Sequence, residues 1–195
     1  MLDAWVHGWA ISRSTAAPVQ IPGGYRIDVG LPGHRVRYVL PTYDAGLVDG
    51  LGEADTWLKI CGHVALGSPW QVQPLEYLMT SQLTAAPVTV AASYELQSTR
   101  RNSIVEVIVT AADGSVAARG KAALTGEAAV FDQIETDPQH RRRGLGRTVM
   151  SALSTSAQDA GATTGVLVAT EDGRALYTAL GWTLHSPMTA AVSRG

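Results

Sequence analysis

The chain has 195 residues, of which 46% are apolar and 16% charged, with a formal net charge of −2 and a single cysteine. This composition excludes a disordered or fibrous chain, and the length is ample for a globular core. One cysteine excludes a disulfide-held scaffold, and no apolar run approaches the roughly 20 residues that cross a bilayer. Residues 1–9 also lack the basic start of a secretory signal, so we expect a cytoplasmic protein that does not bind membranes.

The positive charge is concentrated in one short segment. Of 15 basic residues, four are Arg141, Arg142, Arg143 and Arg147. The other 11 basic residues stand against 17 acidic ones, so the rest of the chain has a balance of −6. A nucleic-acid surface needs more basic residues with interleaved aromatic ones, so we expect no nucleic-acid partner.

Residues 1–85 mix helical and extended patterns. Trp5, Val6 and Trp9 share one face of a helix, which predicts a segment anchored in a core. Two runs of period two flank the turn at 30–33, as is typical of a β-hairpin. In chain order we predict a helix over 2–14, hairpin strands over 25–29 and 34–40, a weak helix over 42–51, a strand over 56–61 and a short helix over 75–83.

Residues from about 87 onward give a more regular pattern. Asp113-Gly114 is a strong hairpin signal, and Gly161 and Gly181 are placed to end helices. The predicted elements are strands over 88–99, 103–110, 116–124 and 128–136, a helix over 147–160, a strand over 165–170, a short helix over 173–180 and a strand pair within 182–192. This order predicts an α/β (α+β) fold, with helices packed on a mixed, mostly antiparallel central sheet.

The arginine-rich segment lies between a predicted strand and a predicted helix. Gly144 and Gly146 leave the backbone N–H groups of the first helical turn approachable, and the helix dipole and the arginines add positive charge. Such a turn suits a pyrophosphate. It is neither a Walker A loop nor the dinucleotide-binding fingerprint, because the required lysine or third glycine is absent. A solvated charged turn is the alternative interpretation.

The segment Arg141-Arg-Arg-Gly-Leu-Gly146 resembles the Arg/Gln-x-x-Gly-x-Gly/Ala motif of the GCN5-related N-acetyltransferase (GNAT) superfamily. The resemblance continues through Val166–Thr170 and Arg174–Tyr177 to Leu180-Gly-Trp182, where the family usually has Phe in place of Trp. It covers roughly residues 90–195. We therefore predict a GNAT acyl-CoA-binding core over 86–195, preceded by an N-terminal α/β extension over 1–85. This extension is interpreted either as a substrate-pocket region or as a degenerate partial repeat of the fold.

The resemblance implies an N-acetyltransferase that carries an acetyl group from acetyl-CoA to a small-molecule or peptide amine by direct attack in a ternary complex. A non-catalytic acyl-CoA-binding or regulatory module is the alternative. The resemblance is compatible with a homodimer. We expect no metal, because the five histidines show no metal-ligand spacing and Cys61 with His63 is one pair without a second. The resemblance identifies neither the acceptor nor the acyl-chain length.

The resemblance also implies a set of cofactor-binding residues. Backbone groups of strand 128–136 would pair with the pantetheine, and a β-bulge there would splay two strands and expose such groups. The loop that follows would hold the pyrophosphate. Thr170 occupies a position where the family often has Asn. The predicted cofactor-binding residues are Ile134, Glu135, Thr136, Arg141, Arg142, Arg143, Gly144, Leu145, Gly146, Arg147 and Thr170.

Three residues are the predicted catalytic groups. Tyr177 resembles the family tyrosine that protonates the CoA sulfur, although it could instead be an aromatic core residue. Asp132 and Glu135 are candidate bases on one strand. Strand alternation predicts that they face opposite sides, with Asp132 on the side of Ile134, and on this ground Asp132 is preferred. Either carboxylate could instead partner an arginine or be solvated. Trp57, Trp70 and Tyr77 line either an apolar acceptor pocket or the core.

Overall fold

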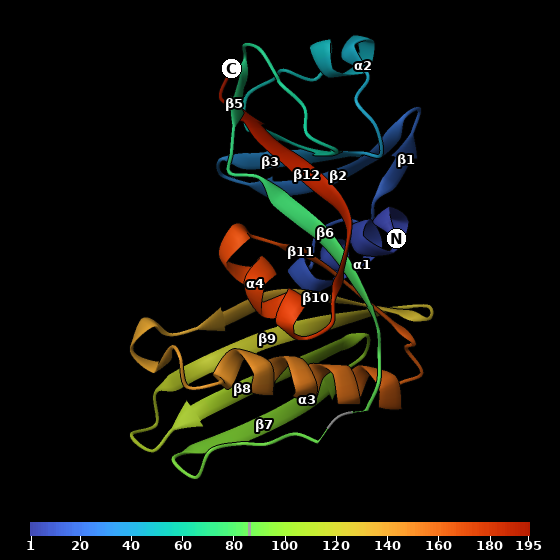
Figure 1. Cartoon of the computed structure of the whole chain (residues 1–195). Helices are drawn as coiled ribbons and strands as arrows, with labels where there is room; N and C mark the ends of the chain where they lie inside the picture. Colours follow the sequence, from blue (N-terminus) through green and yellow to red (C-terminus); the bar gives the residue numbers. More distant parts are fainter. Residues whose placement is uncertain (86) are drawn as a thin grey trace.

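The computed structural model describes residues 1–85 and 87–195 (Figure 1). Residue 86, where the second predicted part begins, lies outside the described residues. The first part contains α1 (Leu2–Arg13), β1 (Val19–Ile21), β2 (Gly24–Leu31), β3 (His34–Leu40), α2 (Ala45–Asp49), β4 (Thr56–Cys61), β5 (Trp70–Val72) and β6 (Glu76–Gln82). The predicted hairpin and the strand over 56–61 are confirmed.

The second part follows the predicted order of elements. It contains β7 (Tyr94–Arg101), β8 (Ile104–Ala111), β9 (Val116–Thr125), β10 (Ala128–Thr136), a 3₁₀ turn (Pro138–His140), α3 (Leu145–Asp159), β11 (Thr164–Ala169), α4 (Glu171–Ala179) and β12 (Thr183–Ser193). Among the described residues, twelve strands form one sheet, and all its pairs except β3–β4 and β10–β11 are antiparallel. The predicted fold class is confirmed.

The two sides of the sheet have the same arrangement of strands, a hairpin that leads into a parallel pair. The order is β1-β2-β3-β4-β12-β6-β11-β10-β9-β8-β7, with β5 paired to β12. A hairpin leads into the parallel pair β3–β4 on one side and into β10–β11 on the other, each with a helix in the connection. β12 of the second part lies beside β4, and β6 of the first part lies beside β11. Each part thus gives a strand to the other, and the division at residues 85 and 86 stays a prediction.

The short helix predicted over 75–83 is wrong, because these residues form β6 near the centre of the sheet. Leu78 packs into the core on the α1 face, whereas Tyr77 and Met79 pack into the core on the α3 face. A strand that is covered on both faces has apolar residues on both, so it lacks the alternation that would identify it. Its partners β11 and β12 also lie far along the chain.

The strand pair predicted within 182–192 is also wrong, because the segment is the single strand β12. The pairing with β6 shifts register between Leu184 and Ser186, just before Pro187. Pro187 has no N–H to donate, but its carbonyl accepts a hydrogen bond from Gly62 N at 2.7 Å. The irregularity at Ser186 and Pro187 bends the strand without ending it.

Three apolar clusters hold the helices against the sheet. α3 packs on β7–β10 over the largest cluster, and α1 packs on β9–β11 from the opposite face (Figure 1). Trp5, Val6 and Trp9 are buried, which confirms the predicted anchoring of the first segment. A Cβ on Gly8 would lie 2.3 Å from a methyl group of Val130, so α1 approaches β10 closely. Within the described residues, no helix has the length and apolar character required to span a membrane.

Candidate functional site

β10 and β11 separate after four paired residues. Ala128 to Phe131 pair in parallel with Thr164 to Leu167, but β10 continues to Thr136 while β11 ends at Ala169. The last residues of β11 pair with β6 alone. The edge of β10 beyond Phe131 is therefore open toward β11, which leaves backbone groups available to a ligand that lies between the two strands.

A β-bulge lies on β10 where the strands separate. Gln133 has φ 55, and the pairing with β9 shifts register between Asp132 and Glu135. Because of the extra residue, Asp132 and Glu135 pair with Lys121 and Arg119, which project from the same face of β9.

The predicted placement of the two carboxylates is therefore wrong. Asp132 contacts α1, whereas Ile134 packs into the core on the α3 face. Asp132 thus shares a face with Glu135 and not with Ile134. Strand alternation failed here because the bulge reverses it.

Asp132 is held by the last turn of α1. Its Oδ2 accepts hydrogen bonds from Ser12 Oγ at 2.9 Å and from Arg13 Nε at 2.6 Å, and its Oδ1 accepts one from Arg13 Nη2 at 2.9 Å. The Asp132 side chain is 14% exposed. Both oxygens are therefore occupied by α1, which favours the alternative in which Asp132 is an arginine partner. Glu135 instead forms an exposed ion pair with Arg119 at 2.7 Å.

The loop before α3 presents a row of free backbone donors. In the described part of the chain, no N–H group of residues 141–147 donates a hydrogen bond. Arg142 and Gly144 have φ values of 61 and 80, so the backbone reverses twice within the loop. Helix α3 begins without a side-chain cap. Consecutive free N–H groups at a helix start attract an anion.

The four arginines of the loop differ in their contacts. Arg141 Nε donates to the Thr136 carbonyl at 3.3 Å, and Arg143 Nη1 donates to the Tyr94 hydroxyl at 3.0 Å. Arg142 and Arg147 form no hydrogen bond or ion pair with other described residues. Both side chains are exposed. Two of the four guanidinium groups are therefore free to bind a ligand.

The start of α3 lies close to α4 and to the end of β10. A Cβ on Gly146 would lie 3.0 Å from Leu176 and 3.9 Å from Thr136. Thr170 caps α4, with its Oγ1 accepting a hydrogen bond from Gly173 N at 3.2 Å. A hollow of about 230 Å³ adjoins Arg147 beside α3. It is lined by Ser81, Gln82, Leu83, Thr84, Arg147, Met150, Ser151, Ser154, Ala179, Leu180 and Trp182.

Tyr177 projects from α4 into the core beside Trp182, with 8% of its surface exposed. Burial and, second, the negative charge of Asp132 raise the pKa of Tyr177 to about 12. Its hydroxyl makes no hydrogen bond with another described residue. The phenol therefore stays protonated at neutral pH and has a proton to donate to a ligand.

The three aromatic candidates for an apolar acceptor pocket are Trp57, Trp70 and Tyr77, and each makes contacts elsewhere in the fold. Trp70 and Tyr77 are core residues, and Tyr77 donates a hydrogen bond to Glu171. Trp57 donates its Nε1 hydrogen to the Gly33 carbonyl at 2.8 Å. None of these three residues lines the hollow beside Arg147.

A group of buried cations near the end of α1 was not predicted. Arg37 is 7% exposed, stacks at 4.0 Å on Trp9 and donates to His34 Nε2 at 3.3 Å. Burial, followed by the charge of Arg13, lowers the pKa of Arg37 to about 9. Burial also lowers the pKa of Lys59, which pairs with Glu76. These residues come from separate strands, so their spacing gives no local signal.

Comparisons with known proteins show what part of the chain and its fold resemble. The model of the FR47-like protein family matches residues 99–190. A GCN5-related N-acetyltransferase from Kribbella flavida has a similar structure, with 16% identity, TM-score 0.71, and coverage of 100% of this chain and 94% of that one. A GNAT-family protein from Novosphingobium aromaticivorans has 19% identity, TM-score 0.63, and coverage of 100% and 96%. A search of curated proteins finds no match to this sequence.

The likeness also extends to a functionally unknown conserved protein from Staphylococcus epidermidis, with 9% identity, TM-score 0.65, and coverage of 99% of this chain and 96% of that one. The fold of the chain is thus that of the GNAT proteins. Residues 99–190 match the FR47-like family model and the whole chain has the fold of GCN5-related N-acetyltransferases, so the predicted resemblance is confirmed.

Proposed function

We propose that this protein transfers an acetyl group from acetyl-CoA to an amine. The observation that carries the proposal is the run of free N–H groups over residues 141–147 at the start of α3, next to the open edge of β10. A CoA molecule offers a pyrophosphate and two amide groups, and these match an anion cradle followed by an unpaired strand edge.

The residues of this region suit the separate parts of CoA. The N–H groups of Arg141–Arg147 would hold the pyrophosphate, with Arg142 adding charge. The pantetheine would lie along Ile134, Glu135 and Thr136. The adenosine end would enter the hollow beside Arg147, where that guanidinium can bind the 3′-phosphate. A Cβ at Gly146 would crowd Leu176, so this position is restricted to a small residue.

Acetyl transfer needs proton movements at two atoms. The amine attacks as its neutral form, so an ammonium first loses one proton. A C–N bond then forms, the C–S bond breaks, and the thiolate of CoA gains a proton. The new amide nitrogen loses another proton, so the overall reaction releases one proton from an ammonium substrate.

Tyr177 is the proposed acid. Because its pKa is raised to about 12, the phenol is protonated at neutral pH and can donate to the departing sulfur. Glu135, or water beside it, is the proposed base, because its carboxylate is exposed and held only by Arg119. Asp132 is the weaker candidate, because Ser12 and Arg13 occupy both of its oxygens.

The second candidate function is acyl-CoA binding without transfer. The occupied carboxylate of Asp132 favours it, because this residue would have to leave Arg13 before it could accept a proton. The two functions differ in their products. We would incubate the chain with acetyl-CoA and a panel of amines, and measure both the released CoA thiol and the acetylated amine. Acetylated product in proportion to thiol supports transfer, whereas tight acetyl-CoA binding with no product from any amine supports the second function.

A further inference from the structure

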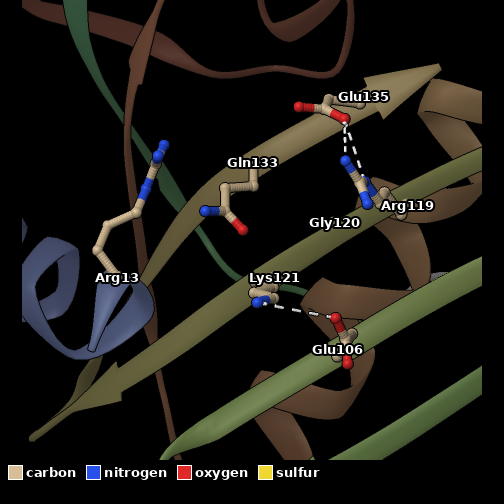
Figure 2. A pocket seen from close by; sticks show the side chains of 7 residues that line it. All are labelled: Arg13, Glu106, Arg119, Gly120, Lys121, Gln133 and Glu135. Atoms are coloured by element: carbon tan, nitrogen blue, oxygen red, sulfur yellow. Dashed lines mark hydrogen bonds and ion pairs between the residues drawn. The ribbon is translucent and has the colours of Figure 1, made fainter. Parts of the chain in front are cut away.

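A polar hollow lies on the face of the sheet that α1 covers in part (Figure 2). Its volume is about 190 Å³. Because one water occupies about 30 Å³ of liquid, the hollow has room for a small molecule. Its lining comes from α1, β8, β9 and β10 and consists of Arg13, Glu106, Arg119, Gly120, Lys121, Gln133 and Glu135.

The hollow adjoins the point where acyl transfer is proposed. Gln133 and Glu135 flank Ile134 on the bulge of β10, and both line the hollow. The positive φ of Gln133 belongs to this bulge, and a bulge re-aims the side chain of its extra residue. In Figure 2 the Gln133 side chain lies between Arg13 and the two ion pairs of the hollow. The same bulge therefore forms both the open strand edge and this hollow.

The charges of the hollow have both signs and are paired across neighbouring strands. Glu135 binds Arg119 at 2.7 Å, and Glu106 lies 3.8 Å from Lys121 (Figure 2). The side chains of Arg119 and Glu135 are each 59% exposed. Exposed pairs of this kind are weak, so a ligand that offers both an ammonium and a carboxylate can replace either partner at little cost.

The chemistry of the lining is selective for a charged ligand. No large apolar side chain lines the hollow, so an aromatic or aliphatic amine would lose water without gaining apolar contact. The ammonium of a simple amine could bind Glu106 and Glu135. It would then take Glu135 away from Arg119 and leave the Arg119 guanidinium without a partner. A ligand with its own carboxylate satisfies both sets of groups.

We infer that this hollow binds the acceptor, and that the acceptor is a primary amine carrying its own carboxylate, as a free amino acid does. The inference rests on the proposed function. The ammonium lies against Glu106 and Glu135, and the carboxylate accepts hydrogen bonds from Arg119 and Lys121. The Gln133 amide can bind either group. The ammonium loses its proton to Glu135, the proposed base, or to the water beside it, because the hollow is open to solvent.

The test compares matched acceptors in the full chain with saturating acetyl-CoA. One set is an equimolar mixture of the twenty common amino acids, and the other is the mixture of their amides, which keep the amine but lack the carboxylate. We expect thiol release to be at least about tenfold faster with the amino acids. Arg119→Gln should remove this preference while leaving the KM for acetyl-CoA unchanged.

Arg35→Gln is the matched control, because Arg35 forms a similar exposed pair with Glu53 at 2.6 Å outside the hollow. It should keep the preference for amino acids. Equal rates with both mixtures, or a preference that survives Arg119→Gln, would overturn the inference and leave acetyl-CoA binding intact. A chain that neither binds acetyl-CoA nor releases thiol with any amine would overturn the proposed function and the acceptor role together.

Discussion

Asp132 and Glu135 project from the same face of β10, although they are three residues apart. The bulge at Gln133 adds one residue to the strand, so these carboxylates pair with Lys121 and Arg119 of β9. Asp132 then reaches α1, whereas Glu135 faces the polar hollow. Two carboxylates on one face thus have different environments, and we expect different roles for them.

The first prediction separates these roles by stability. The Asp132 carboxylate is 14% exposed and holds α1 through its hydrogen bonds with Ser12 and Arg13. Asp132→Asn weakens these bonds, so the free energy of unfolding should fall by about 1–3 kcal/mol. Glu135→Gln breaks a pair whose two side chains are 59% exposed, so its effect should stay below about 1 kcal/mol. Urea unfolding measures both. An Asp132→Asn variant that is as stable as the wild type but inactive would instead identify Asp132 as the base.

The second prediction concerns the proposed acid. Tyr177→Phe should lower kcat by about 100-fold or more, because the departing thiolate loses its proton donor. The affinity for acetyl-CoA should not change. Because the pKa of Tyr177 is raised to about 12, turnover should also show no alkaline decline from this residue up to pH 10. Tyr25→Phe, which removes a hydroxyl bound to Asp3, is the control. An unchanged kcat in Tyr177→Phe would exclude the acid role.

The third prediction uses His34. Burial, followed by the charges of Arg37, Arg13 and Lys59, lowers the pKa of His34 to about 4, whereas an unfolded histidine titrates near 6.5. Between these values the unfolded chain binds more protons. The free energy of unfolding therefore falls as the pH drops from about 6.5 to about 4, by about 2 kcal/mol from this half-buried group.

The matched variants for this prediction are His34→Gln and His185→Gln. The first replaces the imidazole with an amide whose oxygen can still accept from Arg37 and which takes up no proton. It should flatten the acid side of the stability profile. The second changes an exposed histidine and should follow the wild type. Urea unfolding at several pH values measures this, and identical profiles for all three proteins would contradict the assigned environment of His34.

The fourth prediction assigns the two free arginines to different phosphates. Arg142→Gln should lower the affinities for CoA and for dephospho-CoA by the same factor, because both ligands carry the pyrophosphate. Arg147→Gln should lower the affinity for CoA by about tenfold and leave the affinity for dephospho-CoA unchanged, because dephospho-CoA lacks the 3′-phosphate. Calorimetric affinities of both ligands for the wild type and the two variants check this. Equal losses for both ligands in Arg147→Gln would exclude Arg147 as the 3′-phosphate contact.

Local signals explain what could be predicted from the sequence. The Asp113-Gly114 turn and the glycines that follow α3 and α4 act within a few residues, so the order of elements from β7 to α4 could be predicted. The phosphate loop could be predicted for the same reason. The glycines, the arginines and the helix start are contiguous, and the structure brings them to one turn.

The features that escaped prediction depend on distant parts of the chain or on one inserted residue. β6 is a strand because β11 and β12 cover its edges, and no local pattern reports this. The contact between Arg13 and Asp132 joins residues that are 119 positions apart. The faces of Asp132 and Glu135 could not be predicted by alternation, because the bulge at Gln133 has no unambiguous sequence signal.

The central claim is that the start of α3 holds one acetyl-CoA per chain. The matching connection between β3 and β4 carries Asp44, Asp49, Glu53 and Asp55 and no basic residue, so it offers no second cradle. Gly144 has φ 80, where any side chain is strained but Asp and Asn are the best tolerated, and there is open space around a Cβ. The Asp and Asn variants therefore share the backbone strain, and only Asp adds negative charge.

Calorimetric titration of acetyl-CoA into the wild type, Gly144→Asn and Gly144→Asp tests this claim most directly. We predict one site per chain in the wild type, a similar site in Gly144→Asn and no detectable binding in Gly144→Asp. No heat from the wild type at millimolar acetyl-CoA, or equal affinity in Gly144→Asp, would contradict the claim.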